Sequence, residues 1–113
     1  MHELSLAMNI VDIAEREARK ANASIVESIT LEIGQCAGIE KSSFDFAWPM
    51  AVKGSVLENA VLNLEKIKGK SKCGFCNNIF DIEQKYDPCP QCGSFNNKLL
   101  SGGQFRIKSI TII

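Results

Sequence analysis

The chain has 113 residues, 45% of them hydrophobic, which is enough for one domain or for one small domain with an insert. Thirteen basic and thirteen acidic side chains cancel, so no overall field attracts nucleic acid or an anionic membrane, although a local basic patch is compatible with this balance. No apolar run approaches the roughly 20 residues of a membrane span. Glu3 and Asp12 stand where a signal peptide would have Lys or Arg followed by an unbroken apolar core, so we expect a cytoplasmic protein.

Residues 4–21 have the spacing of an amphipathic helix. Their apolar stripe comprises Leu4, Met8, Val11, Ala14 and Ala18, broadened by Leu6, Ile10 and Ile13. Asn22 suits the left-handed conformation that often follows a helix. The pattern then changes to period two from Ile29 to Ile33, which predicts a half-buried strand ending at Gly34.

A second helix, a second strand and a third strand follow. Residues 40–53 have helical spacing, with an apolar face made of Phe44, Ala47, Trp48 and Ala51. Pro49 removes a hydrogen bond from this helix, so we expect a kink or an early end there. Residues 62–67 alternate as a strand, and residues 105–113 form another, with a bulge expected after Ile107.

The order of these elements predicts an α+β fold, with two helices on a three-stranded sheet and an inserted zinc-ribbon-like domain that binds its metal through four cysteines. Residues 1–69, completed by the final strand at 104–113, are expected to form the α+β domain. Residues 70–103 are expected to form the zinc-binding domain.

Four cysteines form two C-x-x-C motifs separated by twelve residues: Cys73 and Cys76, then Cys89 and Cys92. Four thiolates suit tetrahedral zinc, and each motif is followed by a residue that tolerates positive φ, namely Asn77 or Gly93. A reducing compartment disfavours two disulfides, and a rubredoxin-like iron site uses similar motifs; the ligand type favours zinc. Because cysteine fills all four positions, we expect this zinc to be structural and not catalytic.

One further cysteine, Cys36, stands apart from these motifs. No histidine or other cysteine is near it in the sequence, so we interpret it as a small buried side chain and not as a reactive thiol.

The only histidine, His2, is in a position that allows metal chelation. The α-amine of Met1, the backbone nitrogen of His2 and its ring Nδ1 can close two fused chelate rings on one ion. A deprotonated amide favours square-planar Ni(II) or Cu(II) over tetrahedral zinc. Glu3 is a candidate for a further donor. The alternative is an ordinary first turn of a helix that binds no metal.

Several of these features occur together in one known family. The opening Met1–Ser5 (MHELS), the LEIG at residues 31–34, the paired C-x-x-C motifs and the IKSI at 107–110 resemble the HypA/HybF family of hydrogenase maturation proteins. The resemblance covers nearly the whole chain in the same order. It implies a nickel metallochaperone that delivers Ni(II) to the large subunit of [NiFe]-hydrogenase together with the HypB GTPase, and in some organisms also serves urease.

By the same resemblance, Met1, His2 and Glu3 are the nickel site, and the four paired cysteines are the zinc ligands. Some members carry a second histidine in the zinc domain, which this chain lacks. The fourth nickel donor therefore stays open. The sequence also leaves open the nickel enzyme served, the partner surface and the choice between monomer and homodimer.

Two other classes of protein compete with this hypothesis. A zinc-ribbon module that binds nucleic acid or the ribosome would need a basic surface with exposed aromatic residues. A weak basic run is present at Lys66, Lys68, Lys70 and Lys72. An enzyme is disfavoured, because no carboxylate, serine or histidine constellation has a readable spacing.

Overall fold

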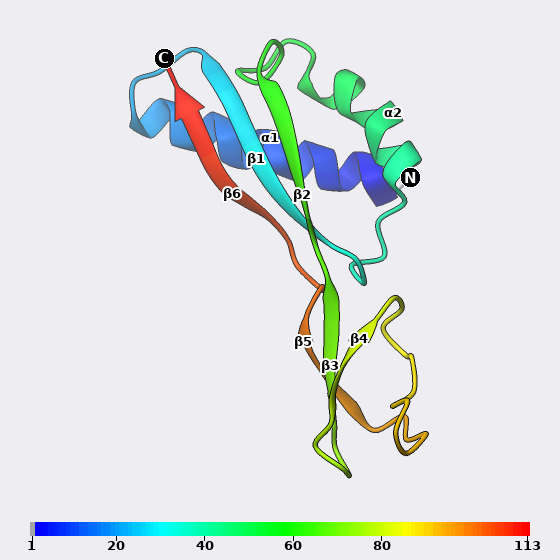
Figure 1. The fold of residues 1–113 in the computed structure, drawn as a ribbon. Coiled ribbons are helices and arrows are strands. Elements are labelled where there is room, and N and C mark those ends of the chain that lie inside the picture. Colours follow the sequence, from blue (N-terminus) through cyan, green and yellow to red (C-terminus); the bar gives the residue numbers. More distant parts are fainter. Residues whose placement is uncertain (1) are drawn as a thin grey trace. The chain divides into compact units, whose positions relative to one another are not determined.

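The computed structural model describes residues 2–113, which form two helices and six strands (Figure 1). In chain order these are α1 (His2–Lys20), β1 (Val26–Gly34), α2 (Lys41–Val52), β2 (Val61–Ile67), β3 (Gly69–Cys73), β4 (Ile79–Ile82), β5 (Asn97–Ser101) and β6 (Phe105–Ile112). One three-stranded sheet has the order β2-β1-β6 and the other has the order β4-β3-β5. The predicted α+β class is confirmed. No helix among the described residues has the length and apolar character needed to cross a membrane.

The chain divides into two compact units, each with its own core. The helical unit comprises the described residues up to Leu31, together with Ile39–Leu64 and Ile107–Ile113. The cysteine unit comprises Glu32–Gly38 and Glu65–Arg106. The assignment of a nickel domain to 1–69 with 104–113, and of a zinc domain to 70–103, stays a prediction about function.

In the helical unit, α1 crosses one face of the β2-β1-β6 sheet and packs against α2 (Figure 1). The residues of α1 that are buried are Ala7, Ile10, Val11, Ala14 and Ala18. The predicted stripe is therefore wrong at Met8, which is 48% exposed, and Ile13 is 37% exposed. Ala7, outside the predicted stripe, is buried instead, because the elements packed against a helix decide which of its faces is covered.

The second helix buries its predicted face, which comprises Phe44, Ala47, Trp48 and Ala51. The rings of Phe44 and Trp48 lie with their centroids 5.6 Å apart. An early end at Pro49 is wrong, because α2 continues to Val52. Proline costs this helix one hydrogen bond, whereas Ala51 and Val52 beyond it are buried and favour continued helix.

The side chain of Glu40 caps the start of α2. Its carboxylate accepts hydrogen bonds from the backbone N–H of Ser43 at 2.5 Å and from the hydroxyl of Ser42 at 2.6 Å. The carboxylate thus satisfies the Ser43 N–H, one of the backbone donors that the first helical turn leaves unpaired. The Ser42 hydroxyl, followed by Ser43, lowers the pKa of Glu40 to about 2.

The β4-β3-β5 sheet organises the cysteine unit. Both neighbours of β3 are antiparallel to it, and the β3–β5 register shifts between Lys70 and Ser71. The residues buried in its core are Cys73, Phe80, Ile82 and Cys89, with Cys36 and Leu99 packed against them. Residues Ile79–Ile82 form β4, which is antiparallel to β3. In β6 the burial pattern slips in phase after Ile107 as expected, while a bulge there stays a prediction.

The segment Glu32–Gly38 joins the cysteine unit through backbone hydrogen bonds. The N–H of Gln35 donates to the carbonyl of Ile67 at 2.8 Å, and the N–H of Cys36 donates to that of Gly102 at 2.7 Å. Glycine is required at position 34, because a Cβ atom there would lie 2.0 Å from the carbonyl oxygen of Gly102. This contact gives a physical reason for the glycine of the LEIG motif.

We predict that Glu40→Ala lowers the melting temperature at neutral pH, because α2 loses its N-terminal cap. The folded-state pKa of about 2 lies below the ordinary value of 4.5. The stabilisation is therefore present above about pH 4.5 and is lost as the pH falls through about 2. Thermal melts of wild type and variant should converge over this pH range. The exposed carboxylate variant Glu58→Ala is the control, and a wild-type-to-variant difference in melting temperature that does not depend on pH would contradict the prediction.

Candidate metal centres

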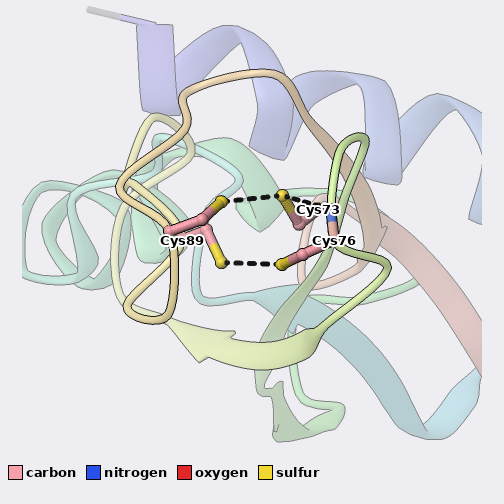
Figure 2. Close-up of side chains that lie close together, drawn as sticks. Cys73, Cys76 and Cys89 are labelled. Atoms are coloured by element: carbon pink, nitrogen blue, oxygen red, sulfur yellow. Dashed lines mark hydrogen bonds between the residues drawn. The ribbon is translucent and has the colours of Figure 1, made fainter.

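The structure brings together four cysteine sulfurs that come from two separate turns. Cys73 ends β3 and Cys76 lies in the turn after it, while Cys89 and Cys92 lie between β4 and β5. All four Sγ atoms lie within 4.8 Å of one another. Figure 2 shows the labelled Cys73, Cys76 and Cys89 directed towards a common centre. The Sγ atoms of Cys73 and Cys92 lie 3.5 Å apart, and those of Cys76 and Cys89 lie 3.6 Å apart.

These distances fit four ligands of one metal ion. A tetrahedron with zinc–sulfur bonds of about 2.3 Å has sulfur–sulfur edges of about 3.8 Å. A disulfide would instead hold its two sulfurs about 2.05 Å apart. All of the cysteines are free thiols here. The donor set therefore fits a tetrahedral, thiolate-binding metal such as zinc.

The two turns are built in the same way. In the first, the N–H of Asn77 donates to the carbonyl of Cys73; in the second, the N–H of Gly93 donates to the carbonyl of Cys89. Asn77 has φ 61° and Gly93 has φ 77°, so the predicted positive φ is confirmed at both. The geometry lets the N–H groups of Phe75 and Cys76 point at the Cys73 sulfur, at 3.4 Å and 3.5 Å.

The environment lowers the pKa of two of the four thiols, Cys73 and Cys89, and raises the pKa of the other two, Cys76 and Cys92. Backbone donation from Cys76 and Phe75 lowers the pKa of Cys73. Burial raises the pKa of Cys89, but N–H groups and neighbouring side chains outweigh burial and lower it to about 6. The N–H of Ser94 lowers the pKa of Cys92, but the adjacent Cys73 sulfur and burial outweigh it and raise that pKa to about 12. Four negative charges this close repel one another, so full ionisation needs a bound cation.

Cys36 lies apart from this cluster and is half-buried, which agrees in part with the expected buried side chain. Its Sγ lies 3.7 Å from the carbonyl oxygen of Glu83. Burial, followed by the charge of Asp87, raises the pKa of the Cys36 thiol. A thiol with a raised pKa has little thiolate at neutral pH and is a poor nucleophile.

Two of the three predicted nickel ligands lie in the first turn of α1. Met1 lies outside the described residues. The side chain of His2 is 62% exposed and that of Glu3 is 14% exposed, with the imidazole Nδ1 3.5 Å from the Glu3 Oε2. Helix α1 begins at His2 and not at residue 4 as expected. The first four N–H groups of a helix have no intrahelical acceptor, so the amides of His2 and Glu3 are not needed by the helix.

Glu40 is part of this region, and sequence reasoning missed it. The Glu3 Oε2 accepts a hydrogen bond from the backbone N–H of Glu40 at 3.3 Å. This N–H, assisted by His2, lowers the pKa of Glu3. No local pattern links positions 37 residues apart, so the sequence carries no signal for this contact. It ties the first turn of α1 to the start of α2.

The fold and the cysteine cluster define a class: a small α+β protein with four clustered cysteines that could hold a metal ion. Residues 1–112 match the family described as "HypA: Hydrogenase/urease nickel incorporation, metallochaperone, hypA". The chain is 44% identical over 112 residues to the hydrogenase maturation factor HypA of Parabacteroides distasonis, covering 99% of this chain and 97% of that one. It is 37% identical to the HypA of Geotalea daltonii over the full length of both chains.

A solved structure has the same fold. The solution structure of the Ni metallochaperone HypA from Helicobacter pylori matches with a TM-score of 0.71 and 26% identity, covering 98% of this chain and 97% of that one. The chain belongs to the HypA family, and the resemblance seen in its sequence is confirmed. Membership supports a role in hydrogenase maturation as a nickel metallochaperone. The names in this family are those of a maturation factor and not of an enzyme.

Proposed function

We propose that the protein binds Ni(II) at Met1, His2 and Glu3 and delivers it for maturation of [NiFe]-hydrogenase, while a structural zinc ion on Cys73, Cys76, Cys89 and Cys92 holds the cysteine unit together. Urease is a second destination that we propose for the nickel. The proposed partners are a HypB-type GTPase, the hydrogenase large subunit and urease accessory proteins, and the site of action is the cytoplasm.

The placement of His2 in the first turn of α1 carries the nickel proposal. The chelate needs the His2 amide nitrogen as a donor, and at the start of a helix this nitrogen can lose its proton without breaking an intrahelical hydrogen bond. The exposed imidazole is accessible to an incoming ion. A free α-amine on Met1 would complete two fused rings, which favour square-planar nickel over tetrahedral zinc.

Glu3 has a second role in this proposal beside that of a further donor. Its carboxylate is fixed by the N–H of Glu40 and lies 3.5 Å from the His2 Nδ1. An anchored carboxylate beside an imidazole orients the ring. Release of the cargo needs only the first helical turn to open, and helix ends open at little cost in free energy. Protons compete with the metal for the ring and the amide, so binding should weaken in acid.

The two proposed metal sites differ in how easily they could release an ion, and a metallochaperone needs one site that releases its ion. The cysteine site is closed by four protein ligands, which suits a resident ion. The N-terminal site draws its donors from one end of the chain and leaves room for exchange with a partner. Copper(II) binds such donors more tightly than nickel, so selectivity depends on metal supply and on the partners.

We predict that His2→Ala, in protein with an unmodified N-terminus, weakens Ni(II) binding at least about 100-fold, because loss of outer-shell partners alone costs about 10–100-fold. Isothermal titration calorimetry measures the affinity, and the zinc content and melting temperature should stay those of wild type. A second variant keeps every side chain but adds one glycine before Met1, which moves histidine away from position two and should also weaken Ni(II) binding. Wild-type affinity in either protein would reject the site.

We predict that zinc removal by a chelator, or Cys73→Ser, unfolds the β4-β3-β5 sheet and leaves the helices intact. Structural zinc contributes on the order of 10 kcal/mol in small modules, and the core of this unit is small. NMR amide dispersion should be lost for Phe80 and Ile82 and kept for Ile10 and Phe44. Cys36→Ser is the control and should retain one zinc ion per chain. A metal-free protein with an unchanged spectrum of the cysteine unit would contradict the structural role.

A further inference from the structure

The cysteine unit has a solvent face with an unusual charge pattern. In β3 the residues alternate, so that Ser71 and Cys73 are buried while Lys70 and Lys72 are exposed. The neighbouring strands contribute exposed residues to the same face. We call this set the lysine face; it comprises Lys70, Lys72, Ile79, Asp81, Lys98 and Leu100.

The strand register places two lysines directly opposite each other. Lys72 pairs with Lys98 across the β3–β5 ladder and with Ile79 across the β3–β4 ladder. Side chains opposite each other in antiparallel strands have Cβ atoms about 4.5–5.5 Å apart, and like charges at such positions destabilise the sheet. The register thus keeps an unfavourable pair at the middle of this face.

No carboxylate within the described residues relieves this pair. Asp81 is the one anionic member of the lysine face, and its Oδ1 already lies 2.9 Å from the Nζ of Lys70. None of the ion pairs of the described residues includes Lys72 or Lys98. Three lysines and one aspartate leave a local surplus of two positive charges on a chain whose net charge is zero.

Two aliphatic side chains flank the charges. Ile79 is 58% exposed and Leu100 is 48% exposed. A ligand that matched this face would bring carboxylates to Lys72 and Lys98 and apolar groups to Ile79 and Leu100. A polypeptide in which acidic and apolar side chains alternate has both.

We propose that the lysine face is a docking surface for an acidic, apolar-containing segment of a partner protein. A single-stranded nucleic acid fits less well, because bases stack on aromatic planes, and the exposed aromatics Phe75, Tyr86 and Phe95 lie outside the strands of this face. The inference uses only residues of the cysteine unit, so it does not depend on nickel binding at His2.

The test uses the zinc-loaded full chain and a fluorescent synthetic peptide of alternating glutamate and leucine, with binding measured by anisotropy. Wild type should bind the peptide, and affinity should fall between about 0.1 M and about 1 M salt as the charges are screened. Lys98→Glu should weaken binding about tenfold. The same variant should raise the melting temperature, because the introduced carboxylate and Lys72 would then attract each other across the strands.

Lys85→Glu is the matched control. It makes the same charge change in the same unit, but Lys85 lies in a loop with its Nζ 5.8 Å from the ring centre of Tyr86. Its affinity for the peptide should stay within about twofold of wild type. Lys98→Gln is a second variant that removes the charge without reversing it and should also weaken binding.

Three outcomes would overturn the proposal. The first is equal peptide affinity in wild type, Lys98→Glu and Lys98→Gln. The second is equal loss in Lys85→Glu, which would show a general charge effect. The third is that oligothymidylate binds wild type in a Lys98-dependent manner while the acidic peptide does not, which would assign the lysine face to nucleic acid.

Discussion

Four sulfur atoms within 4.8 Å of one another are the constraint on which the cysteine unit depends. Its core contains two of these cysteines together with Phe80 and Ile82, so residues that could hold a metal ion also fill the interior. Apolar burial of this size contributes only a few kcal/mol. Under the proposal, a cation that neutralises the thiolates would stabilise the register of the three short strands.

The N-terminal candidate ligands are less enclosed than the four cysteines. The cysteine cluster is enclosed by two turns of matching geometry, whereas His2 and Glu3 occupy one helical turn whose amides have no intrahelical acceptors. The contact of Glu3 with the N–H of Glu40 ties this turn to a distant part of the chain. A permanent ion suits the first arrangement and a transferable ion suits the second.

The lysine face illustrates how a fold can retain an unfavourable contact. The core needs Ser71 and Cys73 on the inner side of β3, and the period of two then places Lys70 and Lys72 outside. Pairing with β5 sets Lys98 opposite Lys72. Repulsion between these lysines is small compared with the cost of turning the buried Ser71 and Cys73 towards solvent, so the fold tolerates it, and an anionic partner would relieve it.

Much of the fold was predictable from local pattern. The two C-x-x-C motifs and the positive φ at Asn77 and Gly93 depend on a few neighbouring residues, which is why sequence reasoning identified them. Hydrophobic periodicity likewise predicted both helices and the buried face of α2. The family also followed from short motifs in a fixed order. The spacing of motif residues and of apolar positions can be read directly from the sequence, which is why these features were predictable.

Other features needed the tertiary structure because they depend on which segments meet. In α1 Ala7 is buried and Met8 is exposed, although hydrophobicity favours the reverse. Burial of Ala51 and Val52 carried α2 past Pro49, and backbone pairing placed Glu32–Gly38 in the cysteine unit. The contact of Glu3 with Glu40 and the opposition of Lys72 and Lys98 also arise between distant positions. The sequence by itself determined both helices, the strands β1, β2 and β6 and the four-cysteine ligand set, because these follow from local pattern and spacing. Register and packing decided which side chains face one another, because they depend on how distant segments meet.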